Sequence, residues 1–389
     1  MLTMTIHRLT DKDFEQAFQL SCYAFQVENP DDHRQRAQKA WDKSINIGAT
    51  ENGQLLSKLA LLPLAVHIHG KTMPMGGLAG VASYPEQRRK GHVRQLLGHT
   101  LQTMRAEGHL LSYLAPFSVS FYRKFGWEIL CENTTYTLNA KQLPKPLPIA
   151  DGKLERVDPS DPRICAVYEK RLCHGMLVRD PQWWDHLQNG AYKAKKAVLY
   201  IDAAGEPSAY MIYTIQKRNF TTEELIFGDQ KGLNALFAFI GQHDSMADTA
   251  ELTVPAAEGL SYFLPDAKTK AETIPYFMAR IVDVALFFQA YPFLADGQGD
   301  FVFRISDPVA EWNDRLFAFS VKNGKAHPTT VRGEEPVFET DIQTLTALML
   351  GYKRPTFFKH AGFIRGDEKA LQDFFRLIPG EQPALVDFF

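Results

Sequence analysis

Apolar positions in the first part of the chain switch from helical spacing to strand spacing. Phe14, Phe18 and Phe25 recur at the interval of an amphipathic helix over residues 13–25. Strand-like runs follow and are separated by turn residues, at 45–50, 55–62, 64–69 and 76–83. Asn52-Gly53, between the first two runs, is a strong hairpin signal. The pattern therefore predicts an antiparallel meander.

A long helix is predicted directly after a basic turn. Its apolar residues share one face over residues 93–107, and Gly108 stands where a C-terminal cap belongs. The strand-like run at 109–115 should be parallel to the strand at 76–83, because a helix connects the two. This part of the chain is thus predicted to be a mixed sheet with one β-α-β unit.

A second copy of this layout is predicted after a proline-rich linker at 143–148, where three prolines exclude a helix or a central strand. The copy consists of helices at 163–172 and 181–187, strands at 195–202, 208–217 and 224–228, a helix at 233–242 and a strand at 251–255. Its turn at 228–232 lacks the arginines of the first turn. We therefore interpret it as a degenerate, inactive copy.

A third unit begins near Arg280 with an apolar run at 281–288. Strands are predicted at 300–305 and 316–321, followed by an Asn-Gly hairpin that leads to 329–332. A strand starting at 337 precedes Asp341, which can cap a helix that runs through Leu350. The last predicted helix covers 367–377.

Composition limits the possible functions. The 389 residues predict two or three domains, and a net charge of −2 gives no basic excess for nucleic acid. The four cysteines form no CxxC pair, which argues against a disulfide framework or a zinc site. The N-terminus has no secretion core and no apolar run is long enough to span a membrane, so a cytoplasmic protein without membrane contact is expected.

Two groups of polar residues are possible functional sites, and each also has a purely structural explanation. His67 and His69 alternate along a strand and could share a metal, but no third ligand is evident and we expect none. Glu28, Asp31 and Asp32 either line a mouth that attracts amines or form a polar loop, and the loop is favoured.

The basic turn is predicted to hold a pyrophosphate. It lies between a strand and a helix start, where successive backbone N–H groups have no intrahelical partner and the helix dipole favours anions. Gly91 lets the backbone approach a ligand closely. The residues concerned are Arg88, Arg89, Lys90, Gly91, His92, Val93 and Arg94. A solvated basic loop is the alternative.

These residues resemble the acetyl-coenzyme A signature of the GCN5-related N-acetyltransferases (GNAT), [Q/R]xxGx[G/A]. The match is Arg88-x-x-Gly91-x-Val93, and Val93 departs from the small residue of the signature. Over the whole length the chain is similar to the Eis-like (enhanced intracellular survival) acetyltransferases, including segments at 85–97, 116–127 and 278–284.

The resemblance implies an α/β (α+β) fold with two tandem GNAT-like mixed-sheet domains and a sterol carrier protein-like domain. We place a catalytic domain at 1–148, a degenerate one at 149–278 and the third at 279–389, with the chain terminus reaching the active site. It also implies acetyl-CoA as co-substrate, contacts from Phe117 and Ser118, and a homo-oligomer, namely a hexamer.

The chemistry of acetyl transfer to an amine suggests roles for further residues. Backbone N–H groups of Val81, Ala82 and Ser83 can polarise the thioester carbonyl if their strand splays from its neighbour. Tyr122 is the expected general acid, because a phenol with a pKa of about 10 stays protonated; a core aromatic is the alternative. In the family, the carboxylate of the last residue, here Phe389, is the base; burial would raise its pKa and make it more competent.

The expected activity is an acetyl-CoA-dependent N-acetyltransferase acting on small cationic amines such as aminoglycosides or polyamines, or on lysine side chains. The alternative is a protein that binds a lipid or another apolar ligand, or a regulatory scaffold protein, with a vestigial acetyltransferase fold.

Overall fold

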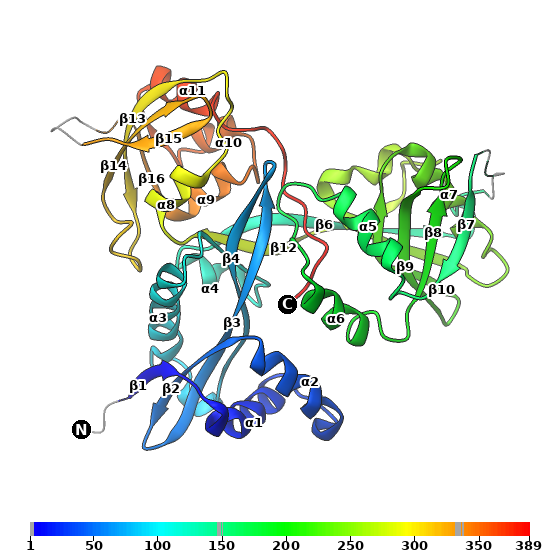
Figure 1. The fold of residues 1–389 in the computed structure, drawn as a ribbon, viewed down its shortest axis with the longest axis horizontal. Helices are drawn as coiled ribbons and strands as arrows, with labels where there is room; N and C mark the ends of the chain where they lie inside the picture. The colour runs from blue at the N-terminus through cyan, green and yellow to red at the C-terminus, as the bar shows by residue number, and fades with distance from the viewer. Residues whose placement is uncertain (1–3, 146–148, 150, 331–335, 337) are drawn as a thin grey trace. The chain divides into compact units, whose positions relative to one another are not determined.

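The computed structural model describes residues 4–145, 149, 151–330, 336 and 338–389, apart from the Asp32 side chain. The chain forms two compact units (Figure 1), which are described separately. The first unit is made of Met1–Leu130, Phe277–Gln382 and Phe388–Phe389. The second unit is made of Cys131–Tyr276 and Pro383–Asp387.

The first unit begins with a mixed sheet in the order β1-β2-β3-β4-β5-β12. Its strands are β1 (Thr5–Arg8), β2 (Ile45–Glu51), β3 (Gln54–Ile68), β4 (Lys71–Ser83), β5 (Leu111–Leu114) and the end of β12 (Lys270–Ile281), which enters this unit at Phe277. Its helices are α1 (Phe14–Ala24), α2 (Pro30–Asp42), α3 (His92–Ala106) and α4 (Val119–Arg123), with short 3-10 turns at Asp11–Asp13 and Pro85–Gln87. β4 and β5 are parallel, as the connecting helix predicted.

Helices cover both faces of this sheet. Leu59 on β3 and Leu96 and Leu101 on α3 share one buried cluster. Leu20 on α1 and Ala82 on β4 share another. Because consecutive strand residues point to opposite faces, Val81 packs toward the α3 cluster and Ala82 toward the α1 cluster.

Two local predictions for this region are wrong. The runs at 55–62 and 64–69 form one strand, β3, which passes through Pro63. β2 pairs with β3 only as far as Ile45↔Leu61, so the missing N–H of Pro63 costs no hydrogen bond on that side. Asp31 and Asp32 do not lie in a polar loop, because α2 starts at Pro30, a residue that favours the first helical position.

The first unit also contains a five-stranded sheet in the order β15-β14-β13-β16-β17. Its strands are β13 (Gly299–Ser306), β14 (Leu316–Lys322), β15 (Lys325–Pro328), β16 (Phe338–Asp341) and β17 (Arg365–Gly366). Its helices are α8 (Val284–Ala290), α9 (Ile342–Met349), α10 (Pro355–His360) and α11 (Glu368–Phe375). Asp341 caps α9 as predicted, accepting from the Thr344 N–H at 2.7 Å.

The predicted hairpin at Asn323-Gly324 is present, but its second strand, β15, ends before residue 329. The prediction for 329–332 falls partly outside the described residues, since 331 and 332 are not described. The start of the next strand at 337 is likewise outside them. The core of this region is a group of stacked phenylalanines, such as Phe303 against Phe338 with ring centroids 5.0 Å apart.

The second unit repeats the layout of the first sheet, in the order β6-β11-β10-β9-β8-β7. Its strands are β6 (Glu128–Asn139), β7 (Lys153–Val157), β8 (Lys196–Ile201), β9 (Pro207–Gln216), β10 (Asn219–Phe227) and β11 (Thr249–Pro255). Its helices are α5 (Pro162–Lys170), α6 (Pro181–Asn189) and α7 (Gln230–Gly241), with short 3-10 turns at Ala256–Glu258 and Leu260–Tyr262. The predicted linker at 143–148 lies partly outside the described residues.

Among the described residues, no helix combines the length and the apolar character that crossing a membrane would require.

Candidate active site

The site is built where β4 and β5 part. Their parallel pairing runs from Met75↔Leu111 to Leu78↔Leu114, whereas β4 continues to Ser83 paired with β3. A bulge falls opposite Lys58–Ala60, and Gly80 within it has a φ of +57°. The backbone of Val81, Ala82 and Ser83 therefore lies beyond the last β4–β5 pair, which is the divergence that the proposed carbonyl contact needs.

A turn and a helix start follow β4 directly. A 3-10 turn at Pro85–Gln87 leads to Arg89, with a φ of +63°, and to Gly91, with a φ of +86°. Gly91 is the N-cap of α3, and no side chain caps the helix there. A Cβ at Gly91 would meet nothing within 4 Å, so its left-handed backbone, rather than crowding, is what favours glycine.

The basic side chains of this turn face solvent. Arg88, Arg89, Lys90 and Arg94 are all exposed, and Lys90 Nζ donates to Gln87 Oε1 at 3.0 Å. Within the described part of the chain none of the four forms an ion pair with a carboxylate. His92 and Val93 open the helix and are half-buried, and Val93 packs toward the α3 cluster. The turn combines open backbone donors with unneutralised positive charge.

Tyr122 lies on α4 and is 2% exposed. Burial raises the pKa of its phenol to about 12. Its ring packs edge-on against Phe121 and Trp127, within the same buried cluster that contains Val81 and Val93. The structure thus brings Tyr122 together with residues of β4 and α3, and its phenol keeps its proton at any ordinary assay pH.

Phe117 and Ser118 precede α4. Phe117 is 71% exposed, and its ring centroid lies 5.3 Å from that of Tyr122. Ser118 is the N-cap of α4 and accepts from the Phe121 N–H at 3.3 Å. The exposed ring of Phe117, beside the buried Tyr122, is therefore available to contact a ligand. The Ser118 hydroxyl is already used in capping α4.

Phe389 lies against β4. A Cβ added to Gly77 would come within 2.8 Å of Phe389 Cε2, and the ring of Phe389 lies 4.8 Å from that of Phe277 on β12. Gly77 pairs with Tyr113, one residue before the last β4–β5 pair. The last residue of the chain is therefore next to the point of strand divergence, while its neighbour Phe388 is 65% exposed.

Lys58 is a residue of this site that the sequence reasoning missed. It is 7% exposed, pairs with Ala82, and its Nζ lies 3.4 Å from where a Cβ on Gly80 would stand. Burial lowers its pKa to about 8, and no ion pair joins it to a carboxylate of the described residues. The sequence did contain a signal for it, because Lys58 is a charged residue within the otherwise apolar run at 55–62.

The corresponding opening in the second unit has different chemistry. The parallel pairing of β10 with β11 ends at Thr221↔Glu251, and a bulge follows between Thr222 and Glu224. The Thr222 hydroxyl bridges the diverging strands, accepting from the Thr253 N–H at 3.0 Å. The opening is thus partly closed by a side chain of its own strand.

The helix start after β10 is also closed. Asp229 caps α7 by accepting from the Gly232 N–H at 2.9 Å, so a carboxylate occupies the place of an anionic ligand. Lys231 forms an ion pair with Asp151 at 3.2 Å. At this helix start one backbone donor already has a side-chain partner, whereas α3 begins without a side-chain cap.

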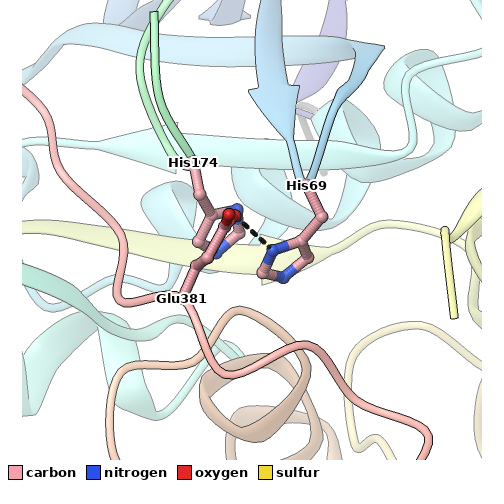
Figure 2. Close-up of side chains that lie close together, drawn as sticks. All are labelled: His69, His174 and Glu381. Carbon is pink, nitrogen blue, oxygen red and sulfur yellow. Dashed lines mark hydrogen bonds and ion pairs between the residues drawn. The ribbon is translucent and has the colours of Figure 1, made fainter. Parts of the chain in front are cut away.

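The two histidines weighed for metal binding have different partners. His69 Nδ1 lies 2.9 Å from Glu381 Oε2 (Figure 2), and burial lowers the pKa of His69 although Glu381 opposes this. His67 Nε2 instead accepts from the Gly70 N–H at 3.2 Å. The two side chains therefore do not act as one pair.

Comparison with known families gives three matches. An acetyltransferase (GNAT) domain model matches residues 5–130, a second GNAT model matches 175–281, and a sterol carrier protein domain model matches 284–386. No curated protein matches the chain.

Solved structures share the complete architecture. A probable N-acyltransferase from Enterococcus faecalis is 29% identical with a TM-score of 0.95, and each chain is covered completely. Two more solved structures match, each with complete coverage of both chains. One is a GCN5-related N-acetyltransferase from Anabaena variabilis, with 21% identity and a TM-score of 0.87, and the other is Eis1 from Mycobacterium abscessus, with 21% identity and a TM-score of 0.81. At these lower identities the likeness shows the fold.

The chain contains two acetyltransferase (GNAT) domains followed by a sterol carrier protein domain. These matches confirm the predicted fold class and the resemblance to GNAT acetyltransferases, and the chain shares its complete fold with Eis1.

Proposed function

We propose that the protein is an acetyl-CoA-dependent N-acetyltransferase whose acceptors are amines of cationic substrates, such as aminoglycosides, polyamines or lysine side chains. The observation that carries the proposal is the divergence of β4 and β5 directly before a helix that starts without a side-chain cap. GNAT-class matches in the family models and in the Enterococcus faecalis structure support it.

The proposed roles follow from where the residues lie. The turn from Arg88 to Arg94 binds the pyrophosphate through backbone N–H groups and positive side chains. Backbone donors of Val81, Ala82 and Ser83 polarise the thioester carbonyl, and Phe117 with Ser118 borders the bound coenzyme. Acetyl-CoA supplies the activated acetyl group.

In the proposed reaction the acceptor nitrogen attacks the carbonyl carbon, an N–C bond forms and the C–S bond breaks. The leaving thiolate takes the proton of Tyr122. The acceptor ammonium loses two protons in all: the first passes to the terminal carboxylate of Phe389 before the attack, and the second restores the phenol of Tyr122 as the amide forms. Tyr122 is protonated at neutral pH and is therefore available as a donor. Because burial raises its pKa to about 12, proton transfer to a thiolate is more uphill than for an ordinary phenol and needs a positioned hydrogen bond to the leaving sulfur.

Turnover tests the proposal directly. The full-length protein is incubated with acetyl-CoA and a panel of aminoglycosides, polyamines and lysine peptides, and free thiol and acetylated product are measured. Thiol release that depends on an amine supports the proposal. A folded protein that acetylates no member of the panel contradicts it.

The proposed base has its own test. Adding one glycine after Phe389 moves the carboxylate by a residue, which should lower kcat by about 10²-fold or more, as for loss of a general base. Coenzyme affinity should change little, because the pyrophosphate turn is untouched. Normal turnover of the extended protein would exclude the terminal carboxylate as base.

We also propose that the protein is a homo-oligomer, and a hexamer is the state implied by the resemblance. Sedimentation velocity on the full chain tests this, and a monomer at micromolar concentration would contradict it.

A second candidate function is binding of an apolar ligand by the sterol carrier protein-like region. A cavity of about 390 Å³ is lined there by Phe357, Phe358 and Phe363 on one side. Charged and polar side chains complete the lining, among them Arg123, Glu128, Asp341, Gln343 and Lys353. Native mass spectrometry of the purified protein distinguishes the two candidates. A retained lipid without coenzyme affinity would favour the carrier.

A further inference from the structure

Pro383–Asp387, which we call the tail, belongs to the second unit and is held tightly there. Leu385 is 0% and Asp387 1% exposed, and the Ala384 N–H donates to the His174 carbonyl oxygen at 2.8 Å. A Cβ on Gly175, which has a φ of +93°, would come within 2.9 Å of the Ala384 carbonyl oxygen. Chain ends normally fray, so this degree of burial needs specific contacts.

Asp387 supplies those contacts. Its carboxylate accepts from Arg179 Nε at 2.9 Å, Trp183 Nε1 at 2.7 Å and the Tyr168 hydroxyl at 3.1 Å. Its backbone carbonyl accepts from the Tyr276 hydroxyl at 3.0 Å. All these groups are donors, so the network fits an ionised Asp387, and Arg179 counteracts the rise in its pKa that burial causes.

Arg179 connects the tail to β10. Its side chain is completely buried, and it forms a second ion pair with Glu224 at 2.6 Å. The Glu224 carboxylate also accepts from the hydroxyls of Tyr192 and Tyr210. The Arg179 guanidinium carbon lies 3.8 Å from the ring centroid of Tyr168. One cation, two carboxylates and several phenols thus satisfy one another, as buried charges require.

This network is located at the opening of the second GNAT domain. Glu224 follows the bulge at which β10 leaves β11, and Ala384 and Val386 of the tail line the same small cavity as Phe227 and Pro255. The diverging ends of β10 and β11 therefore hold a segment of the chain itself. In the first domain the equivalent opening, between β4 and β5, is the proposed coenzyme site.

We propose that the second GNAT domain is a clamp for the tail, and that Asp387 and Arg179 are positioning residues for the terminal carboxylate. This inference rests on the proposed function, in which that carboxylate is the base. Only Phe388 and Phe389 follow Asp387, and two residues span at most about 7 Å. Clamping Asp387 therefore restricts the terminal carboxylate to a small volume. A domain that has lost its anion site is retained because it orders the tail.

The experiment compares Asp387→Asn with the wild type in two measurements on the full-length protein. Digestion with a carboxypeptidase, followed by intact mass, reports release of Phe389 and Phe388. We expect the variant to lose them at least about tenfold faster, as ordering by the ion pair is removed. In steady-state turnover we expect kcat to fall by about tenfold or more while KM for acetyl-CoA changes less than about twofold.

The control is Asp248→Asn, which removes an exposed ion pair with Arg218 in the same unit and should change neither measurement. Tyr276→Phe is the milder variant should Asp387→Asn fail to fold, since it removes one hydroxyl, and it should accelerate digestion by a smaller factor. Equal digestion rates for wild type and folded variants overturn the clamp. Faster digestion with unchanged kcat overturns the positioning role. If the wild type shows no acetyl transfer, the proposed function fails, but the digestion rates still test the clamp.

Discussion

The two GNAT domains have the same strand order, but the helix that follows the diverging strands starts differently in each. After β4, Gly91 starts α3 without a side-chain cap, among exposed arginines. After β10, Asp229 caps α7 with its own carboxylate. The first helix start is therefore open to an external anion, while the second is already satisfied by an internal one.

The buried cations of the two domains differ in the same way. Arg179 has two carboxylate partners, whereas Lys58 has none among the described residues and its pKa is lowered to about 8 by burial. In the second domain the buried cation is balanced by two carboxylates. The first keeps uncompensated groups, which are costly for stability and typical of sites that bind ligands.

The largest expected effect comes from Tyr122→Phe, which removes the proton donor but preserves the ring packing. We expect kcat to fall by about 10²–10⁴-fold with little change in coenzyme affinity. Because the pKa of Tyr122 is raised to about 12, the wild type should show no alkaline loss of kcat from this group below about pH 10. A kcat–pH profile of both proteins, with Tyr262→Phe as an exposed control, checks this.

Lys58→Met tests the unpaired charge. The folded protein releases the Lys58 proton near pH 8 and the unfolded chain near pH 10.5, so the unfolded chain binds more protons between these values. Stability of the wild type should therefore rise across that window. At pH 7 the variant should be more stable by roughly 1–3 kcal/mol, and the gain should vanish above about pH 10.5.

Denaturant unfolding at pH 7 and pH 10.5 measures this difference. Lys196→Met, at an exposed strand position, is the matched control and should show no such dependence. An Lys58→Met variant that is less stable than the wild type at pH 7 would show that the ammonium has a favourable partner.

Gly91→Asp gives the first domain the cap chemistry of the second. The carboxylate would compete with the pyrophosphate, so the Kd for coenzyme A should rise by about tenfold or more, and less at high salt. Gly91→Ala is the control for the left-handed backbone, which costs about 1–2 kcal/mol without adding charge. Equal coenzyme affinities for the Ala and Asp variants would exclude an anion site at this turn.

Asp229→Ala is expected to have the smallest effect. Loss of the cap should lower the free energy of unfolding by about 1 kcal/mol, and Asp229→Asn should retain most of it. Turnover and coenzyme affinity should not change, because this turn is not used for binding. Thermal unfolding and titration with coenzyme A measure both quantities, and altered coenzyme affinity would contradict the assignment.

Local signals explain what the sequence predicted well. The helix near 93–107, the hairpin at Asn52-Gly53 and the cap at Asp341 depend on residues a few positions apart, and the structure has all three. The motif around Gly91 is local too, which is why the candidate phosphate turn was found.

Long-range pairing explains what was missed. β6 and β12 were not predicted, because both are fixed by pairing with strands distant in the sequence. β12 pairs with β5, as in Met278↔Leu114, and β6 pairs with β11, as in Leu138↔Ala250. Lys58 and Asp387 each stand alone in an apolar segment, and only the folded chain shows that one lacks a carboxylate partner while the other has Arg179. Only the folded chain likewise shows that the helix after β10 has a side-chain cap and the helix after β4 has none.

Calorimetric titration of the full-length protein with coenzyme A tests most directly whether the N-terminus of α3, but not that of α7, binds a diphosphate. We predict a stoichiometry of one coenzyme per chain, with the Kd raised by about tenfold or more in Gly91→Asp and unchanged in Asp229→Ala. Two coenzymes per chain, or no heat of binding by a well-folded protein, would contradict it.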